Sequence, residues 1–145
     1  MAIDQISVRL VSQTIGEVEG VFILGEHVYG DHVTLTLQYP SGEITTQAAD
    51  YFEALCQIRR QLEPAGWRPV CYGSSRNVWP SGMCRGMGLG LKAYKTQLGQ
   101  RALFADLVRI FDSGDDVEPS SVEEQQQFHQ AWLQSLGFDK RSRTK

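Results

Sequence analysis

Several side chains that could act as nucleophiles fall within a short stretch of the chain: Cys71, Ser74, Ser75, Ser81 and Cys84. A catalytic nucleophile needs a base within hydrogen-bond reach and usually a third group that orients the base. Residues 64–105 contain no Asp, Glu or His, so a base would have to come from another segment, such as His32 or His129. The sequence therefore favours structural roles for the cysteines, and we expect a protein that is not an enzyme.

The sequence also matches known metal-binding and phosphate-binding motifs poorly. The three cysteines and three histidines are widely spaced and form no CxxC pair, no HExxH motif and no cluster, so we expect no metal site and no disulfide framework. Residues 86–92 (GMGLGLK) approach a phosphate-binding loop, but Leu91 separates Gly90 from Lys92 and Ala93 replaces the required hydroxyl. Glycines also permit positive φ or close backbone approach. We expect no bound cofactor.

The richest group of recognition-type side chains lies in an acid-free basic segment, residues 67–105. Arg and Trp dominate binding hot spots, and basic segments with aromatic residues can hold phosphates or stack on bases. The candidate partner- or anion-binding residues are Arg76, Asn77, Trp79, Ser81, Met83, Arg85, Lys92 and Tyr94. An alternative stays open, in which the cations pair internally with the acidic strands and the acids of residues 112–124. Trp79 would then fill the core under the loop.

Length and composition place these residues in one ordinary globular domain. The chain has 145 residues, of which 41% are hydrophobic and 21% charged, so we expect a single domain over residues 1–139 and a flexible basic tail over residues 140–145. A net charge of −3 argues against a protein that coats nucleic acid. The start, MAIDQISVRL, does not resemble a signal peptide, and no long apolar run is present. We therefore expect a cytoplasmic protein without membrane spans.

The first half of the sequence has a period of two, followed by a helical period. Alternation predicts strands over residues 6–11, 17–24, 32–39 and 43–47, joined by a connection over residues 26–31 and a turn at residues 40–43. Asp50, with Glu53 three residues later, resembles a capping box and predicts a helix over residues 50–63.

The second half is less regular. Short strands are predicted over residues 67–72, 91–98 and 107–112, with a helical turn at residues 103–106 and a long irregular segment over residues 73–90. The capping box from Ser121 to Glu124 starts a final helix, with Gly137 at its end and Phe138 folding back onto Leu133. The order is strands, helix, strands, helix. We therefore predict an α+β fold, with one antiparallel sheet packed on one face by two helices.

The stretch from Leu55 to Phe111 resembles a family of small uncharacterised bacterial proteins. The resemblance rests on the loop RNVWPSGM (residues 76–83), the strand GLKAY (residues 90–94), the segment LVRIFD and the closing helix segment FHQAWL. It covers roughly half of the chain. Small acidic proteins of this type are similar to immunity proteins, so the resemblance implies binding and neutralisation of a bacterial toxin.

Three functions remain in competition. The first is a non-enzymatic cytosolic protein that binds one cognate protein, a toxin. The second is a small enzyme or ligand-binding domain in which residues 73–95 hold an anionic, phosphate-bearing ligand, with Arg76, Arg85 and Lys92 as the anion contacts. The third, nucleic-acid binding through the same segment, is disfavoured by the acidic composition.

Overall fold

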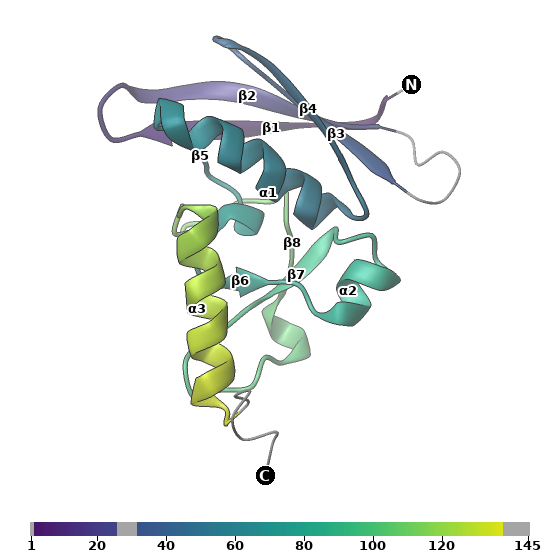
Figure 1. Ribbon diagram of the computed structural model, residues 1–145, viewed down its shortest axis with the longest axis vertical. Coiled ribbons are helices and arrows are strands. Elements are labelled where there is room, and N and C mark those ends of the chain that lie inside the picture. Colours follow the sequence, from purple (N-terminus) through teal and green to yellow (C-terminus); the bar gives the residue numbers. More distant parts are fainter. Residues whose placement is uncertain (1, 26–31, 138–145) are drawn as a thin grey trace.

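The structure, a computed structural model, describes residues 2–25 and 32–137 (Figure 1). Its largest element is a five-stranded antiparallel sheet with the strand order β4-β3-β2-β1-β5. Alternating apolar residues build this sheet, since Val33, Leu35 and Leu37 are fully buried while the residues between them are not. The strands are β1 (Ala2–Ser12), β2 (Gly16–Gly25), β3 (Val33–Tyr39), β4 (Gly42–Ala48) and β5 (Arg68–Pro69).

One face of this sheet is covered by α1 (Tyr51–Leu62), which lies beneath the strands in Figure 1. The helix begins where the Asp50 carboxylate accepts a hydrogen bond from the backbone N–H of Glu53 at 2.8 Å. Its buried face carries Phe52, Leu55 and Ile58, which are fully buried with the inner residues of the sheet.

The other half of the molecule contains a three-stranded antiparallel sheet and two helices. The sheet order is β6-β7-β8. The helix α3 runs beside β6 and meets the end of α1 (Figure 1). The elements are β6 (Val78–Trp79), α2 (Gly82–Gly86), β7 (Lys92–Lys95), β8 (Leu107–Arg109) and α3 (Val122–Ser135), with 3₁₀ turns at Glu63–Ala65, Tyr72–Ser74 and Phe104–Asp106.

The predicted α+β class is confirmed, but the described residues form two antiparallel sheets instead of one. The predicted order of strands, helix, strands, helix is not confirmed, because the additional helix α2 lies between β6 and β7. The segment over residues 67–72 pairs with β1 at Arg68–Pro69, and the Val70 N–H donates to the Arg9 carbonyl at 2.8 Å before the chain turns into a 3₁₀ helix. The predicted strands 91–98 and 107–112 shorten to β7 and β8. The segment 73–90, predicted to be irregular, contains the strand β6 and the helix α2. The Ser81 hydroxyl caps the start of α2 by accepting a hydrogen bond from the backbone N–H of Cys84.

Helix boundaries follow the local signals. Ser121 and Glu124 form the predicted capping box of α3, and Gly137 takes the left-handed conformation with φ of 87°. Two predictions, the connection over residues 26–31 and the packing of Phe138, lie outside the described residues, as does the basic tail. No helix within residues 2–25 and 32–137 is long and apolar enough to cross a membrane.

A buried polar network joins the two halves. The side chain of Arg59, on α1, is 1% exposed and donates to Gln125 Oε1 at 2.6 Å and to the Ser120 carbonyl at 3.0 Å. Gln125, on α3, is fully buried and donates from Nε2 to the carbonyls of Gly73, Ser75 and Val78 at 2.9–3.0 Å. The network therefore fixes α3 and the start of the basic segment against α1.

Candidate binding surface

A column of aromatic rings crosses from the core to the surface beside α3. The ring of Trp79 packs edge-on against Phe52, with ring centroids 5.3 Å apart. On its other side it stacks on His129 at 4.5 Å and 11°, and His129 in turn stacks on Trp132 at 5.9 Å. Trp132 is held in place because its indole N–H donates to the Gln100 carbonyl at 2.9 Å. The column is therefore rigid at its surface end, a property of binding anchors.

An apolar groove opens along the outer end of this column. It has a volume of about 330 Å³, within the range of small-ligand or side-chain pockets. Its walls come from β6, β7, α3 and the segment that crosses beneath α3: Trp79, Pro80, Ser81, Tyr94, Thr96, Arg101, Ala102, His129, Trp132 and Leu136. We name this cavity, defined by these lining residues, the aromatic groove.

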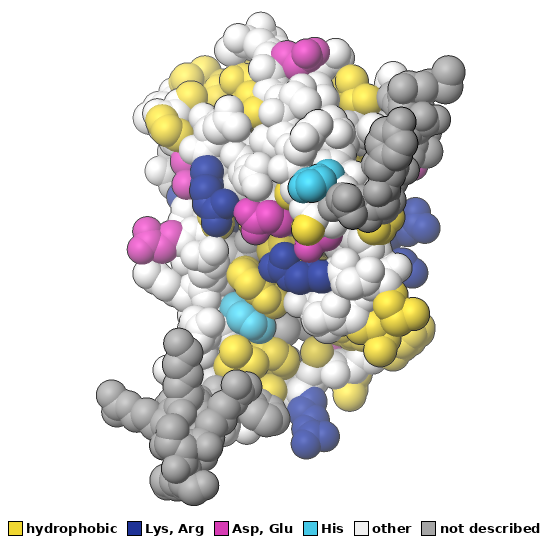
Figure 2. Space-filling view, turned by 45° about the vertical axis from the view of Figure 1, so that its right-hand side comes forward, with side chains coloured by type: hydrophobic (Ala, Val, Ile, Leu, Met, Phe, Trp, Pro, Cys, Tyr) yellow, Lys and Arg dark blue, Asp and Glu magenta, His cyan; other side chains and the backbone are white. Residues whose placement is uncertain are grey.

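Large apolar side chains stand exposed near the aromatic groove. Leu103 and Phe104 follow the lining residue Ala102 and are 65% and 84% exposed. On α2, which follows the lining residue Ser81, Met83 is 72% exposed. Figure 2 shows hydrophobic side chains gathered on the lower part of this face, around a histidine. Exposed apolar surface that gathers beside a cavity marks interaction sites in soluble proteins.

The position of His129 disfavours the protonated form of its imidazole. Burial, and to a smaller degree the positive charge of Arg85, lower the pKa of His129 below its ordinary value of 6.5. Nδ1 of His129 is buried and has no hydrogen-bond partner among the described residues. A neutral ring stacked between two indoles keeps the column apolar near pH 7.

We expect an NMR titration to give His129 a pKa below 6.5, and Arg85→Gln to raise that pKa without restoring it fully, because burial is the larger cause. In the unfolded chain His129 binds a proton near pH 6.5, whereas in the folded chain it binds this proton only at lower pH. The free energy of unfolding therefore falls as the pH drops below about 6.5. A wild-type pKa at or above 6.5 would contradict the stacked, buried position of the ring. His129→Phe should weaken the dependence of stability on pH in this range.

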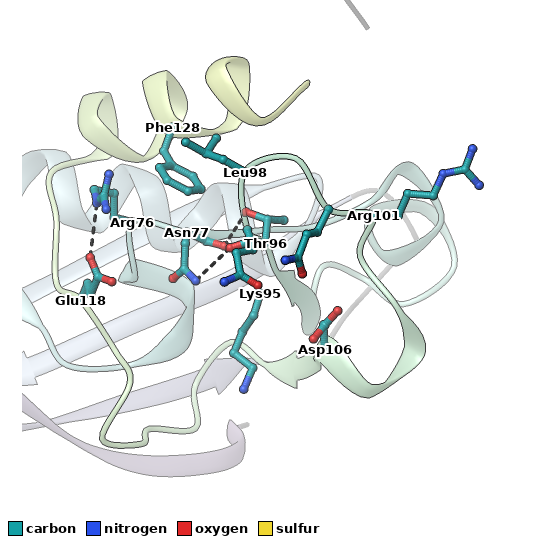
Figure 3. A pocket seen from close by; sticks show the side chains of 11 residues that line it. Arg76, Asn77, Lys95, Thr96, Leu98, Arg101, Asp106, Glu118 and Phe128 are labelled. Atoms are coloured by element: carbon teal, nitrogen blue, oxygen red, sulfur yellow. Dashed lines mark hydrogen bonds and ion pairs between the residues drawn. The ribbon is translucent and has the colours of Figure 1, made fainter. Parts of the chain in front are cut away.

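A second, polar hollow lies on the other side of the segment 96–101 and has a volume of about 470 Å³. Three cations line it, but Figure 3 shows that they do not converge, because Arg101 extends outward and Lys95 points away from Arg76. Arg76 pairs with Glu118 at 3.3 Å and lies over the Phe128 ring at 4.7 Å. The hollow therefore offers no cluster of cations aimed at a single anion.

The carboxylate of Asp116 neutralises Lys95. Lys95 Nζ lies 3.1 Å from Asp116 Oδ2, and the Tyr72 hydroxyl donates to Oδ1 at 2.7 Å. The hydrogen bond from Tyr72 is the main cause that lowers the pKa of Asp116, and the same bond raises the pKa of Tyr72 to about 12. The alternative interpretation of the basic segment, internal pairing with the acids of residues 112–124, is thus confirmed for Arg76 and Lys95.

The glycine-rich segment over residues 86–92 packs against the start of α1. The backbone N–H of Tyr51 donates to the Leu89 carbonyl at 2.8 Å, and Arg85 lies 3.3 Å from the buried Asp50 carboxylate. Gly90 has φ of 70°, and a Cβ there would lie 2.7 Å from Asp50 Oδ1. The segment follows a short helix and leads into β7, the reverse of a phosphate-binding loop, which leads into a helix. Gly88 and Gly90 serve close approach, the alternative given above, whereas a Cβ at Gly86 would meet no atom within 4 Å.

The structure distributes the predicted site residues over several places. Trp79, Ser81 and Tyr94 meet in the aromatic groove, whereas Arg76 and Asn77 line the polar hollow. Arg85 is bound to Asp50, and Met83 projects from α2. Lys92 lies apart, opposite Arg109 on β8, beside a third cavity. Two of these residues have structural roles, since Ser81 caps α2 and Asn77 Nδ2 donates to the Thr96 carbonyl at 3.2 Å.

Sequence reasoning missed the α3 side of the aromatic groove. Trp132 and Leu136 belong to the apolar stripe of the final helix, and such a stripe is ordinarily core. In the structure both are only partly buried. The sequence holds no signal that separates these two residues from core residues, because they continue the helical spacing of Phe128.

Two of the candidate nucleophiles, Cys71 and Ser74, lie in the core and contact each other. Cys71 and Ser74 are fully buried, their side chains lie 3.2 Å apart, and the Ser74 hydroxyl donates to the Pro69 carbonyl at 2.8 Å. Burial raises the pKa of the Cys71 thiol, which disfavours the reactive thiolate. Among the residues that the structure describes, no three His, Cys, Asp or Glu side chains are grouped so as to hold a metal ion.

Comparison with known proteins yields no family: the sequence matches no protein-family model and no curated protein. Function is therefore inferred from the surfaces described above. Of these, the aromatic groove combines an apolar cavity, stacked rings and exposed apolar neighbours.

Proposed function

We propose that the chain is a non-enzymatic binding protein that holds a protein partner in its aromatic groove. The observation that carries this proposal is the stacked column of Trp79, His129 and Trp132, which ends in an open apolar cavity. Rings fixed before binding lose little side-chain entropy when a partner docks. A buried Trp or Tyr anchor at the centre of an interface is the usual form of a binding hot spot.

The partner that we propose is one cognate bacterial toxin, which the chain neutralises in the cytoplasm as an immunity protein. The resemblance of the segment 55–111 to small bacterial proteins supports this choice. In this proposal the motif RNVWPSGM contributes the groove wall through Trp79, Pro80 and Ser81. Its other members shape the segment, since Asn77 binds Thr96 and Arg76 pairs with Glu118.

The competing function, an anionic ligand held by residues 73–95, has weaker support. Two of its three proposed anion contacts, Arg76 and Arg85, already lie beside carboxylates of this chain. The third, Lys92, lines a cavity to which neither Arg76 nor Arg85 contributes. A phosphate bound to Arg76 would have to displace Glu118, and one bound to Arg85 would have to displace Asp50. In either position it would contact only one of the three proposed cations.

The proposed function predicts that filling the aromatic groove abolishes protection. We expect the wild-type chain to restore growth of cells that express the product of the adjacent gene, and to bind that product in calorimetry. Ala102→Arg should weaken binding by at least about 30-fold, the equivalent of losing a 2 kcal/mol hot spot, because it places a long charged side chain in the cavity. Gln130→Arg, on the exposed side of α3, serves as the matched control and should bind as the wild type does.

Two results would count against the proposal. Full protection by Ala102→Arg would remove the aromatic groove from the interface. If the wild type neither bound nor protected against the adjacent gene product, the immunity proposal would be wrong. A saturable thermal shift with inorganic phosphate or nucleotides, lost in Arg76→Ala, would favour the anion-binding alternative.

A further inference from the structure

The two edges of the five-stranded sheet are very different. One edge is β5, which has only two residues and contains Pro69. The other is β4, which runs for seven residues (GEITTQA) without Pro, Lys or a register shift against β3. On its outer side β4 pairs with no strand among the described residues. Natural sheets protect long edges with Pro, Lys, bulges or a covering segment, so an unprotected edge of this length calls for a partner strand.

The register of the β3–β4 hairpin shows which backbone groups of β4 point outward. Tyr39 and Gly42 face each other across a two-residue turn and form a hydrogen-bonded pair. Hydrogen-bonded and non-hydrogen-bonded pairs alternate in an antiparallel ladder. The N–H and C=O groups of Glu43, Thr45 and Gln47 therefore point away from β3. The side chains of these residues are exposed.

We propose that two copies of this chain pair antiparallel through β4, with Thr45 of one copy opposite Thr45 of the other. In this register Glu43 faces Gln47 of the second copy, and every outward backbone group of these residues finds a partner. The two-fold axis generates the Glu43–Gln47 contact twice and brings no like charges together. The strand is thus complementary to itself, which is the reason for naming a second copy as its occupant.

The same pairings already exist within the sheet. Across β3 and β4, Gln38 Nε2 donates to Glu43 Oε2 at 2.8 Å, and the hydroxyls of Thr36 and Thr45 lie 2.9 Å apart. The second oxygen of Glu43 remains available for Gln47 of the other copy, because a carboxylate accepts several hydrogen bonds. The dimer would therefore continue a pattern of Gln–Glu and Thr–Thr neighbours across the new ladder.

The geometry of the molecule is compatible with this pairing. An axis perpendicular to the sheet places both copies of α1 on the same face, since each α1 covers β3 and β4 of its own copy. The side chains of α1 that stay accessible are polar and include the ion pair between Glu53 and Arg60. The aromatic groove is built from β6, β7 and α3, in the other half of the molecule (Figure 1), so the dimer leaves it open.

The test is the mass of the full chain in solution by light scattering across a concentration series up to about 100 μM, a range in which standard interfaces associate. We expect a mass that approaches twice 16.3 kDa. Gln47→Glu should raise the dissociation constant at least about tenfold, because it sets Glu43 opposite a second carboxylate twice. The double variant Glu43→Lys with Gln47→Glu should restore the dimer through opposite charges. Gln126→Glu, on the exposed side of α3, adds the same charge elsewhere and should leave the mass unchanged.

Folding is monitored by circular dichroism, so that loss of the dimer is separated from loss of structure. As a second probe, Thr45→Pro removes an outward N–H and keeps the backbone ladder to β3, because the Thr45 N–H points away from β3. Within the monomer it removes only the exposed hydrogen bond between the Thr36 and Thr45 hydroxyls, so it should give a folded monomer. A monomeric wild type at the highest concentration would overturn the proposal. So would a dimer that survives both Gln47→Glu and Thr45→Pro, or one that dissociates with Ala102→Arg in the aromatic groove.

Discussion

We expect Gln125→Leu to lower the free energy of unfolding by about 3–5 kcal/mol, the cost of removing one member of a buried charged network. Leucine is close to glutamine in size but offers no hydrogen bonds. It would leave the guanidinium of Arg59 without its shortest contact, 2.6 Å to Gln125 Oε1. It would also remove the hydrogen bonds that Gln125 Nε2 donates to the carbonyls of Gly73, Ser75 and Val78. These three residues lie in the segment that leads to Trp79 and the aromatic groove.

Urea denaturation measures this effect, with Gln126→Leu as the matched control. Gln126 is the next residue of α3 and is exposed, so its substitution should change the free energy of unfolding by less than about 0.5 kcal/mol. Arg59→Met combined with Gln125→Leu should cost clearly less than the sum of the two single changes, because the second removal leaves no orphaned partner side chain. Equal stabilities of Gln125→Leu and Gln126→Leu would mean that the network contributes little.

Gly90→Ala should be the most damaging single change in the glycine-rich segment, with a loss of about 3 kcal/mol. Two costs add: an alanine at φ of 70° is strained, and its Cβ would lie 2.7 Å from Asp50 Oδ1 and 2.9 Å from Phe52 N. Both contacts are with the start of α1, where Asp50 caps the helix. The neighbouring backbone cannot move aside without breaking the bond from Tyr51 N to the Leu89 carbonyl.

Gly99→Ala separates these two costs. Gly99 has a similar φ of 78°, but a Cβ there would meet no atom within 4 Å. Its substitution should therefore cost only the conformational part, about 1 kcal/mol. Thermal unfolding of both variants gives the comparison. If Gly90→Ala were no worse than Gly99→Ala, the segment would not be fixed against α1 in the way described.

Much of the fold was predictable from the sequence because the signals are local. The alternation of Val33, Leu35 and Leu37 places every second residue of β3 in the core, as the pleat requires. The Asp50 and Ser121 caps mark where α1 and α3 begin, since each side chain reaches an N–H only three residues away. The predicted boundaries of these elements differ from the observed ones by a residue or two.

The short strands of the second half could not be predicted with the same accuracy. β5, β6 and β8 have two or three residues each, too few to show a period, and their pairing depends on distant segments. The sequence predicts a loop over residues 73–90 because glycine-rich stretches are typical of irregular segments. Its order comes from contacts with α1 and α3, such as the Arg85–Asp50 pair, whose members are 35 residues apart.

By itself, the sequence determined the α+β class, the strands of the first half, the two long helices and the basic, acid-free character of residues 67–105. Only the tertiary structure decided what those cations meet: Arg76 finds Glu118 from 42 residues away. It also decided that Arg59 is buried while its neighbour Arg60 is exposed, and that Trp79 meets His129. The physical reason is that a backbone period acts over a few residues, whereas ion pairs, ring stacks and cavities depend on where distant turns bring the chain together.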